Sequence, residues 1–396
     1  MSESLKPLRL NAHADRRLRV GHLWIYSNEV DVAKTPLKAF TPGELVRVED
    51  ARGKSLGIAY LNPNTLLSGR ILSSKSDAVI DATWFLRRLQ SALALRERLY
   101  AEPYYRLVYG ESDGLPGLIV DRYGDYLSVQ ITTAGMERLK PFLLDALQQL
   151  LQPRGIVLRN DSSSREQEQL PAENDVIGTV PDTVEIVEDG VRYAVALAAG
   201  QKTGFFYDQR DNRGRLRRYV AGKSVLDVFS YVGAWALRAA HYGASAVTCL
   251  DASQPALDAA QVNAGLNGVS LETIREDALA GLKALRGAGR SFDVIVVDPP
   301  ALIKRKKDVD AGQEHYAALN RAAMQLLSAD GILIACSCSH HLETEQLQRL
   351  LLRESKTLGR RLQILEQGGQ GPDHPVHPAI PETRYLKGFV CRVVSG

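Results

Sequence analysis

One segment governs the architecture of the C-terminal half of the chain: Val225-Leu226-Asp227-Val228-Phe229-Ser230-Tyr231-Val232-Gly233. Its apolar first half predicts a buried strand, and the helical pattern that begins after Gly233 predicts a helix over 234–241. A strand that runs through a short turn into a helix is the unit from which parallel α/β sheets are built. Ligands bind outside the carboxyl ends of the strands in such sheets, so we expect Asp227 and Gly233 to face a ligand crevice.

The same alternation of strand and helix continues along the chain. Further strand-like runs lie at 246–250, 272–275, 292–298 and 331–336. Alternating strands and helices predict a doubly wound, Rossmann-like parallel sheet. Two more strands, at 363–367 and 387–394, flank a stretch rich in glycine and proline, and we expect them to pair as an antiparallel hairpin at the sheet edge.

Two smaller regions precede this sheet. Short strand signals, separated by turn residues, lie at 45–48, 57–60 and 68–72. Their spacing is typical of a small β-barrel, which we place at residues 1–75. Residues 76–189 mix strand signals with two helical patterns, the second over 136–151, and predict a central α/β domain. The large sheet then occupies a third domain, residues 190–396.

The composition is that of an ordinary globular protein. The chain has 396 residues, of which 45% are hydrophobic and 24% charged, and this balance excludes disordered and collagen-like chains. The net charge of +3 is compatible with a nucleic-acid partner but does not require one. The 4 cysteines are too few for a disulfide framework, and the N-terminus lacks the apolar segment of a signal peptide. No apolar run reaches membrane-spanning length, so we expect a cytoplasmic protein.

A second acid follows the next strand of the predicted sheet. Asp251 ends that strand as Asp227 ends the first, and an acid at this place suits hydrogen bonds to ribose hydroxyls. Either acid alone is better explained as a helix cap or a strand end, but the two in register favour a nucleoside-like cofactor. The segment has one glycine of the G-x-G-x-x-G pattern, so a dinucleotide is poorly supported.

The strongest strand-like run ends in Asp298-Pro299-Pro300. Consecutive prolines cannot continue a central strand, so the chain must turn here. The stiff turn would fix the Asp298 carboxylate at the crevice, where it could accept hydrogen bonds from the exocyclic amine of a base. A plain exit loop remains the alternative interpretation.

The following strand ends in Cys336-Ser337-Cys338-Ser339. A strand period of two places Cys336 and Cys338 on one face, with Cys336 inside the strand and Cys338 at its lip beside the Asp298 turn. A thiol at that lip can act as a nucleophile if its pKa is lowered, whereas Cys336 is better explained as an inert buried thiol. The histidines that follow do not complete a standard zinc spacing, so no metal site is predicted.

The residues just upstream of the first strand suit a lid over a nucleoside. They form Gly200-Gln201-Lys202-Thr203-Gly204-Phe205-Phe206-Tyr207-Asp208-Gln209-Arg210, and Phe206 and Gln209 are the candidate contacts. A basic helix follows, and a second basic run follows the Pro-Pro turn. Phosphate contacts are predicted for Arg210, Arg213, Arg217, Lys304, Arg305 and Lys306. Basic runs that flank one crevice fit a phosphate-rich substrate, although a solvated helix face gives the same pattern.

Together these motifs resemble those of class I S-adenosylmethionine-dependent methyltransferases. The similarity extends to most of the chain through motifs at 21–26, 110–118 and 203–210, and the whole is similar to the ribosomal RNA large subunit methyltransferase I family. The resemblance implies an N-terminal PUA domain, a central α/β domain and a C-terminal methyltransferase domain. It also implies a large-subunit ribosomal RNA partner and a homodimer.

The resemblance assigns roles to individual residues. It implies that S-adenosylmethionine is bound by Asp227, Tyr231, Gly233, Asp251, Asp277 and Asp298, with Phe206 and Gln209 beside it. It further implies methylation of carbon 5 of a cytosine in 23S ribosomal RNA. The Cys338 thiolate would attack carbon 6, and Asp298 would bind the base edge and stabilise the adduct.

Two other functions compete with this one. An amino-methyltransferase acting on adenine or guanine also uses an Asp-Pro-Pro turn, but an aromatic residue usually follows it, and here Ala301 does. An exocyclic amine also needs no cysteine. A non-enzymatic RNA-binding module would suit the barrel and the basic runs but leaves the cofactor crevice unexplained.

Overall fold

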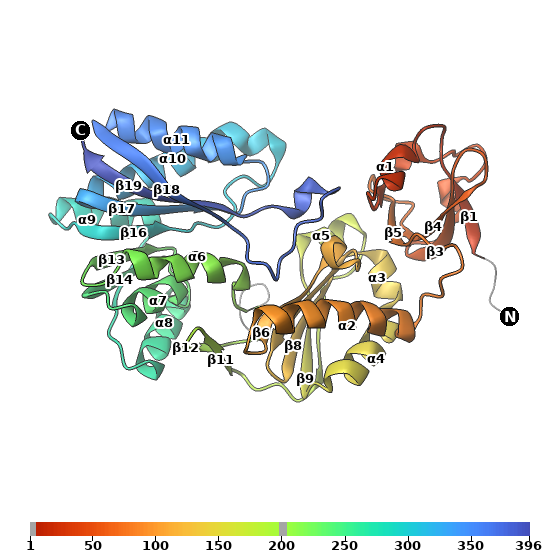
Figure 1. Ribbon diagram of the computed structural model, residues 1–396, viewed down its shortest axis with the longest axis horizontal. Coiled ribbons are helices and arrows are strands. Elements are labelled where there is room, and N and C mark those ends of the chain that lie inside the picture. The colour runs from red at the N-terminus through yellow and green to blue at the C-terminus, as the bar shows by residue number, and fades with distance from the viewer. Residues whose placement is uncertain (1–4, 198–203) are drawn as a thin grey trace. The chain divides into compact units, whose positions relative to one another are not determined.

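The computed structural model describes residues 5–197 and 204–396, which divide into two compact units (Figure 1). Unit 1 contains the chain up to Val184 together with Val195–Tyr207 and Pro372–Thr383. Unit 2 contains Glu185–Ala194, Asp208–Gly371 and Arg384–Gly396. The chain therefore leaves and re-enters both units. The regions 1–75 and 76–189 each supply one sheet of unit 1, and we retain the three-domain division as a proposal.

The first sheet of unit 1 has five strands in the order β1-β3-β4-β5-β2. Their bounds are β1 Lys6–Arg9, β2 Trp24–Ile25, β3 Glu44–Glu49, β4 Ser55–Leu61 and β5 Gly69–Ser73, and the short helix α1 spans Arg16–Arg19. The sequence predicted β3, β4 and β5 but missed β1 and β2, which are too short to show an alternating pattern. Gly57 has φ +131, and a Cβ there would lie 2.1 Å from the Ser73 carbonyl oxygen, so this position of β4 requires glycine.

The second sheet of unit 1 has the order β10-β9-β8-β7-β6. Its strands are β6 Tyr104–Tyr109, β7 Leu118–Tyr123, β8 Tyr126–Ile131, β9 Gly155–Asn160 and β10 Glu173–Gly178. The helices are α2 Ala82–Leu99, α3 Ala134–Arg138, α4 Lys140–Leu151 and α5 Ser163–Gln167. The predicted helix over 136–151 is thus two helices, interrupted at Leu139, because Pro141 lacks an N–H for a continuous ladder.

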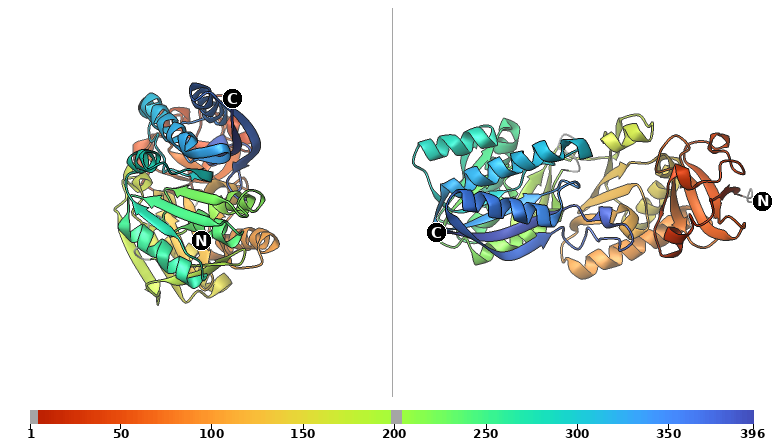
Figure 2. Two further views of the ribbon diagram at one scale, coloured as in Figure 1. Left: turned by 90° about the vertical axis from the view of Figure 1, so that its left-hand side faces the viewer. Right: turned by 90° about the horizontal axis from the view of Figure 1, so that it is seen from above.

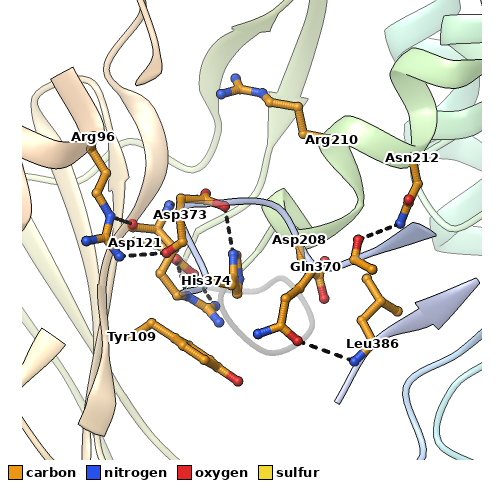
Figure 3. Close-up of polar contacts among 12 residues, drawn as sticks. Arg96, Tyr109, Asp121, Asp208, Arg210, Asn212, Gln370, Asp373, His374 and Leu386 are labelled. Atoms are coloured by element: carbon orange, nitrogen blue, oxygen red, sulfur yellow. Dashed lines mark hydrogen bonds and ion pairs between the residues drawn. The ribbon is translucent and has the colours of Figure 1, made fainter. Parts of the chain in front are cut away.

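The segment Pro372–Thr383 is anchored in unit 1 by buried polar contacts (Figure 3). Arg96 donates from Nη2 to the Asp373 carbonyl oxygen at 2.6 Å, and the Arg106 backbone N–H donates to Asp373 Oδ2 at 3.0 Å. Asp373 Oδ1 lies 2.8 Å from His374 Nδ1, and both side chains are buried. Within unit 2, Gln370 Oε1 accepts the backbone N–H of Leu386 at 3.5 Å, close to the points where the chain leaves and returns (Figure 3).

Unit 2 contains a seven-stranded sheet in the order β15-β14-β13-β16-β17-β19-β18. The strands are β13 Ser224–Val228, β14 Ala246–Asp251, β15 Glu272–Arg275, β16 Phe292–Val297, β17 Leu327–Ser337, β18 Arg360–Gly369 and β19 Lys387–Ser395. β13 to β17 are parallel, and β19 runs antiparallel to both β17 and β18. The doubly wound sheet and its edge hairpin are confirmed. The strand order reverses between β13 and β16, which is the ligand-binding position of such sheets.

Helices cover both faces of this sheet (Figures 1 and 2). They are α7 Ala234–His241, α8 Gln254–Leu266, α9 Ala278–Gly287, α10 Val309–Leu326 and α11 Thr344–Thr357, with α6 at Arg210–Arg215 and the hairpin β11 Val184–Glu188 and β12 Val191–Val195 outside the sheet. Leu226 and Val228 pack with α9, α10 and α11 in one core, whereas Asp227 points to the opposite face. No described helix is both long and apolar enough to cross a membrane.

Candidate active site

The turn between β13 and α7 has an unusual backbone. Phe229, Tyr231 and Gly233 have positive φ values of 65°, 47° and 78°. The left-handed region is unfavourable for the two aromatic residues, and strain of this kind clusters at functional sites. At Gly233 a Cβ would lie 3.0 Å from the Ala260 Cβ of α8. The turn is therefore folded tightly over the end of β13, and Gly233 is needed for that packing.

Asp227 is the buried acid under this turn. Its Oδ2 accepts the backbone N–H of Ala236 at 3.1 Å, so it caps α7 as the simpler interpretation predicted. Its Oδ1 is buried and has no hydrogen-bond partner among the described residues. Burial, reinforced by the nearby Asp298 carboxylate, raises the pKa of Asp227 to about 8. A buried acceptor without a partner is a place where a donor of a bound ligand would be stabilised.

Asp251 is the last residue of β14 and also binds the turn between β13 and α7. Its Oδ2 accepts the Tyr231 backbone N–H at 2.9 Å, and its Oδ1 accepts the Ser253 backbone N–H at 2.9 Å. The side chain is half-buried. A carboxylate offers about four lone-pair sites, so Asp251 keeps acceptor capacity for the two hydroxyls of a ribose.

Asp277 has a clear local role. It is the N-cap of α9, and its Oδ1 accepts the backbone N–H groups of Leu279 and Ala280 at 3.0 and 3.2 Å. The backbone N–H of the preceding Glu276 donates to the Asp251 carbonyl oxygen at 3.1 Å, so the fold places Asp277 close to Asp251. Asp277 is exposed, and its second carboxylate oxygen has no hydrogen-bond partner among the described residues.

Asp298 directly follows β16 and is held by two donors. Gln209 Nε2 donates to Oδ1 at 2.9 Å, and the indole N–H of Trp235 donates to Oδ2 at 3.0 Å. Burial raises the pKa of Asp298 to about 6, and the hydrogen bonds from Trp235 and Gln209 oppose that rise. The structure thus brings Gln209 and Asp298 within hydrogen-bond distance. The sequence analysis did not identify Trp235 as a site residue. The feature that could have indicated it is its position in the first turn of the helix after Gly233.

Cys338 differs from the other cysteines in its exposure. It follows the last residue of β17, is half-buried, and its Sγ lies 3.8 Å from the Pro299 carbonyl oxygen. Cys249, Cys336 and Cys391 are buried, and burial raises the pKa of each of their thiols. Cys338 therefore combines access to solvent with a position beside the Asp298-Pro299-Pro300 turn.

Hydroxyl groups connect the two loops that carry Asp298 and Cys338. Ser337 Oγ and Ser339 Oγ each lie 2.9 Å from the Tyr316 hydroxyl of α10. Ser339 Oγ also accepts the backbone N–H of Ile303, in the loop after β16, at 3.1 Å. All three hydroxyl-bearing residues are buried. The two serines of the cysteine motif therefore fasten its loop to the proline turn, a role that spacing alone did not reveal.

Two of the predicted RNA contacts are internal. Arg213 is 1% exposed and Arg210 is 6% exposed. Arg213 Nη2 lies 2.6 Å from the fully buried carboxylate of Glu188, and Arg210 Nε lies 3.4 Å from it. This burial argues against the predicted phosphate contacts, because a phosphate cannot reach a side chain that is enclosed and already paired. We therefore leave both arginines out of the RNA surface.

The remaining basic candidates are exposed. Arg217 lies in the short turn of helix after α6, and Lys304, Arg305 and Lys306 follow the proline turn. Arg305 pairs with Asp308 at 3.1 Å, an exposed ion pair that a phosphate can displace at little cost. Phe206 is half-buried and belongs to unit 1. Residues 200–203 of the predicted lid lie outside the described residues.

Comparisons with known proteins identify the families that this chain resembles. A family model described as S-adenosylmethionine-dependent methyltransferase matches residues 155–386, and a PUA-like domain model matches residues 8–74. A ribosomal RNA large subunit methyltransferase I from Cronobacter sakazakii is 39% identical over 94% of this chain and 96% of its own. One from Klebsiella pneumoniae is 39% identical over 100% of both chains.

Solved structures show the same fold. A crystal structure of a methyltransferase complexed with SAH superposes with a TM-score of 0.84 at 23% identity, covering 98% of this chain and 100% of that chain. A SAM-dependent methyltransferase from Streptococcus mutans gives a TM-score of 0.82 at 22% identity, covering 98% and 100%. At this level of identity the likeness concerns the fold, and the fold is shared over nearly the whole chain.

The residues at this sheet edge fit S-adenosylmethionine. Its amino group and ribose hydroxyls are hydrogen-bond donors, and the edge presents the unpartnered Oδ1 of Asp227 and the half-buried carboxylate of Asp251 as acceptors. Matches to a methyltransferase model over most of unit 2 and to full-length relatives point the same way. The chain therefore belongs to the S-adenosylmethionine-dependent methyltransferases, and among them to the ribosomal RNA large subunit methyltransferase I family.

Proposed function

We propose that this protein methylates carbon 5 of a cytosine in 23S ribosomal RNA through a covalent adduct with Cys338. The observation that carries the proposal is the position of Cys338: its thiol is accessible and lies 3.8 Å from the carbonyl oxygen of Pro299, the residue that follows Asp298. The names of the relatives from Cronobacter sakazakii and Klebsiella pneumoniae support large-subunit ribosomal RNA as the substrate. A nucleophilic cysteine is required for carbon 5 of a pyrimidine and superfluous for an exocyclic amine.

The proposed cofactor site follows the turn and the strand ends. Asp227, Tyr231, Gly233, Asp251, Asp277 and Asp298 would surround S-adenosylmethionine, with Gln209 beside Asp298. Asp251 would accept the ribose hydroxyls, because the Tyr231 backbone already holds it at the end of β14. When bound, the cofactor supplies an electrophilic methyl group.

The proposed reaction begins at carbon 6 of the cytosine. Carbon 5 is a poor nucleophile, and addition of the Cys338 thiolate to carbon 6 forms a carbon–sulfur bond and moves electron density to carbon 5. Carbon 5 would then form its bond to the methyl group as the bond between that methyl group and the sulfonium sulfur breaks, which leaves S-adenosylhomocysteine. Loss of the carbon 5 proton to a base breaks the carbon–sulfur bond and returns the thiolate. The target base must leave its stack to reach such a site.

Asp298 would stabilise the adduct at the N3 and N4 edge of the base. Its pKa of about 6 means that a minor protonated fraction exists at neutral pH, so it can accept from the amino group or donate to N3 as charge develops there. Gln209 and Trp235 hold both of its oxygens in place. A preorganised carboxyl group requires little rearrangement during the reaction.

RNA binding would use both units. We propose that the PUA-like region orients the RNA and that Arg217, Lys304, Arg305 and Lys306 contact phosphates, since these four side chains are exposed. Phosphate contacts release counterions, so RNA affinity should fall as salt rises.

A labelled-methyl assay tests the reaction and its product. Unmodified 23S ribosomal RNA is incubated with the enzyme and methyl-labelled S-adenosylmethionine and is then digested to nucleosides. We expect the label in 5-methylcytidine. Label in adenosine or guanosine would establish the amino-methyltransferase alternative and overturn the proposal.

A further inference from the structure

Lys387 is a buried lysine next to the cysteine loop. It is the first residue of β19, pairs in register with Ser337 of β17, and is 7% exposed. Its Nζ donates to the carbonyl oxygens of Ser339 and Leu342, each at 2.6 Å. Lysine is seldom enclosed in this way without a partner of opposite charge. The ammonium is instead satisfied by two neutral carbonyls of one turn.

That turn begins immediately after Cys338. Lys387 pairs through its backbone with the residue before the cysteine and binds, through its side chain, the residue after it. The contact to Leu342 closes the turn at its far end. Lys387 thus restrains the loop on both sides of the thiol, whereas the neighbouring Gly388 pairs with Cys336 on the other face of the strand.

Lys387 also interacts electrostatically with Cys338. Burial lowers the pKa of Lys387, and the Glu343 carboxylate and Cys338 oppose that change by electrostatic attraction. Other titratable groups around this loop are Tyr316 of α10, whose pKa is raised by burial and further by Cys338, and Cys336 of β17, whose pKa is raised by burial and by the Asp298 carboxylate after β16. His340 and His341 follow Cys338 and are exposed. A cation in this low-dielectric place favours a thiolate over a thiol.

We propose that Lys387 is a positioning residue for the nucleophile, which holds the loop after Cys338 by two carbonyls and stabilises the Cys338 thiolate with its buried positive charge. The proposal rests on the proposed role of Cys338 in the reaction, but it makes a statement about the thiol that is measurable without RNA or cofactor.

The test is the pH dependence of Cys338 alkylation. Iodoacetamide reacts with thiolates, and peptide mass spectrometry separates Cys338 from the three buried cysteines. In Lys387→Met we expect the apparent pKa of Cys338 to rise by about one unit. Lys387→Gln keeps a donor but loses the charge and should show a similar rise, and Lys387→Arg should stay near wild type.

One control variant and one fallback variant keep the test decisive. Lys283→Met removes an exposed positive charge from α9 and should leave the alkylation profile unchanged. If Lys387→Met fails to fold, Lys387→Gln provides the same comparison with less disruption of the turn. An alkylation profile identical to wild type in a folded Lys387→Gln or Lys387→Met protein would overturn the proposal, because Lys387 would then have only a structural role.

Methyl transfer separates this proposal from the proposed function. If both hold, the charge-removing variants lose kcat with little change in KM for RNA, and their pH–rate profile moves to higher pH. If Cys338→Ala retains full activity while the alkylation pKa still depends on Lys387, the covalent mechanism fails and the influence of Lys387 on the thiol stands.

Discussion

Trp235 donates its indole N–H to Asp298 Oδ2 at 3.0 Å, and this bond joins the helix that follows the glycine turn to the acid that follows β16. Trp235 lies in α7, which follows β13, and Asp298 follows β16; β13 and β16 are neighbouring parallel strands at the point where the strand order reverses. The element proposed to hold the cofactor is therefore bonded directly to the acid proposed to bind the base. A substitution of either residue should therefore change both cofactor binding and base binding.

Trp235→Phe should shift the acid side of the pH–rate profile. The indole N–H lowers the pKa of Asp298 by stabilising its carboxylate, so its removal should raise that pKa above about 6. The ionised fraction at pH 6.5 then falls, and we expect the acid limb of kcat/KM to move upward by about half a unit. An unmoved acid limb, with folding preserved, would show that Asp298 ionisation does not control the rate.

Cys338→Ala should abolish methyl transfer while leaving the fold and cofactor affinity nearly intact. The side chain is half-buried at the end of a strand, so its loss creates little cavity. Wild type should form a covalent adduct with RNA that contains 5-fluorocytosine, because fluorine prevents the final loss of a proton from carbon 5.

Cys336→Ala is the matched control for that substitution. The Cys336 thiol is buried, and we expect this variant to keep most of its activity and its adduct. An adduct that maps to Cys336, or full activity without Cys338, would refute the assignment.

Asp251→Ala should weaken S-adenosylmethionine binding by about 1–3 kcal/mol, the usual loss when hydrogen bonds to a charged acceptor are removed. Part of that loss would come from the turn, because Asp251 also accepts the Tyr231 backbone N–H. Isothermal titration calorimetry measures the effect. Asp258→Ala, at an exposed site on α8, is the control that should bind normally. Equal affinities for the two variants would remove Asp251 from the site.

Asp227 should make the cofactor-free protein less stable as pH rises. Its folded pKa is raised to about 8, whereas an unfolded aspartate titrates near about 3.9, so between these values the folded state binds the additional proton. The contribution of Asp227 to the free energy of unfolding is therefore present at low pH and lost as pH rises toward about 8. Asp227→Asn removes this dependence.

Urea unfolding at several pH values between about 5 and 8 checks the prediction for Asp227. We expect a shallower decline of stability with pH in Asp227→Asn than in wild type. Parallel curves for the two proteins would show that the Asp227 carboxyl is not protonated in the folded, cofactor-free state.

Replacing Lys304, Arg305 and Lys306 together by alanine should weaken RNA binding and reduce its salt dependence. Each phosphate contact contributes about 0.7–0.9 to the slope of log affinity against log salt, so three lost contacts should flatten the slope by about 2–3. Filter binding between low and moderate salt measures both effects. Lys356→Ala on the exposed face of α11 serves as a control. A slope unchanged from wild type would exclude this run from the phosphate-binding surface.

The local pattern of apolar and polar residues was sufficient to predict the large sheet of unit 2. The strands at β13, β14, β15 and β16, the helix after Gly233 and the edge hairpin all lie within a few residues of their predicted bounds. The spacing of apolar residues along a strand or helix shows which of its faces are buried. This spacing can be read from residues that are neighbours in the sequence. Position at a strand end likewise singled out Cys338 from the other cysteines.

Contacts between segments that are distant in the sequence determined the features that the sequence did not predict. The burial of Arg213 depends on Glu188 of β11, and the environment of Cys338 depends on Tyr316 of α10 and Lys387 of β19. The passage of Pro372–Thr383 into unit 1 depends on the partners of Asp373 there, which are Arg96 and Arg106. A charged residue looks the same in sequence whether it faces water or a buried partner of opposite charge. Its role is settled only when folding brings that partner within hydrogen-bond distance and removes the water between them.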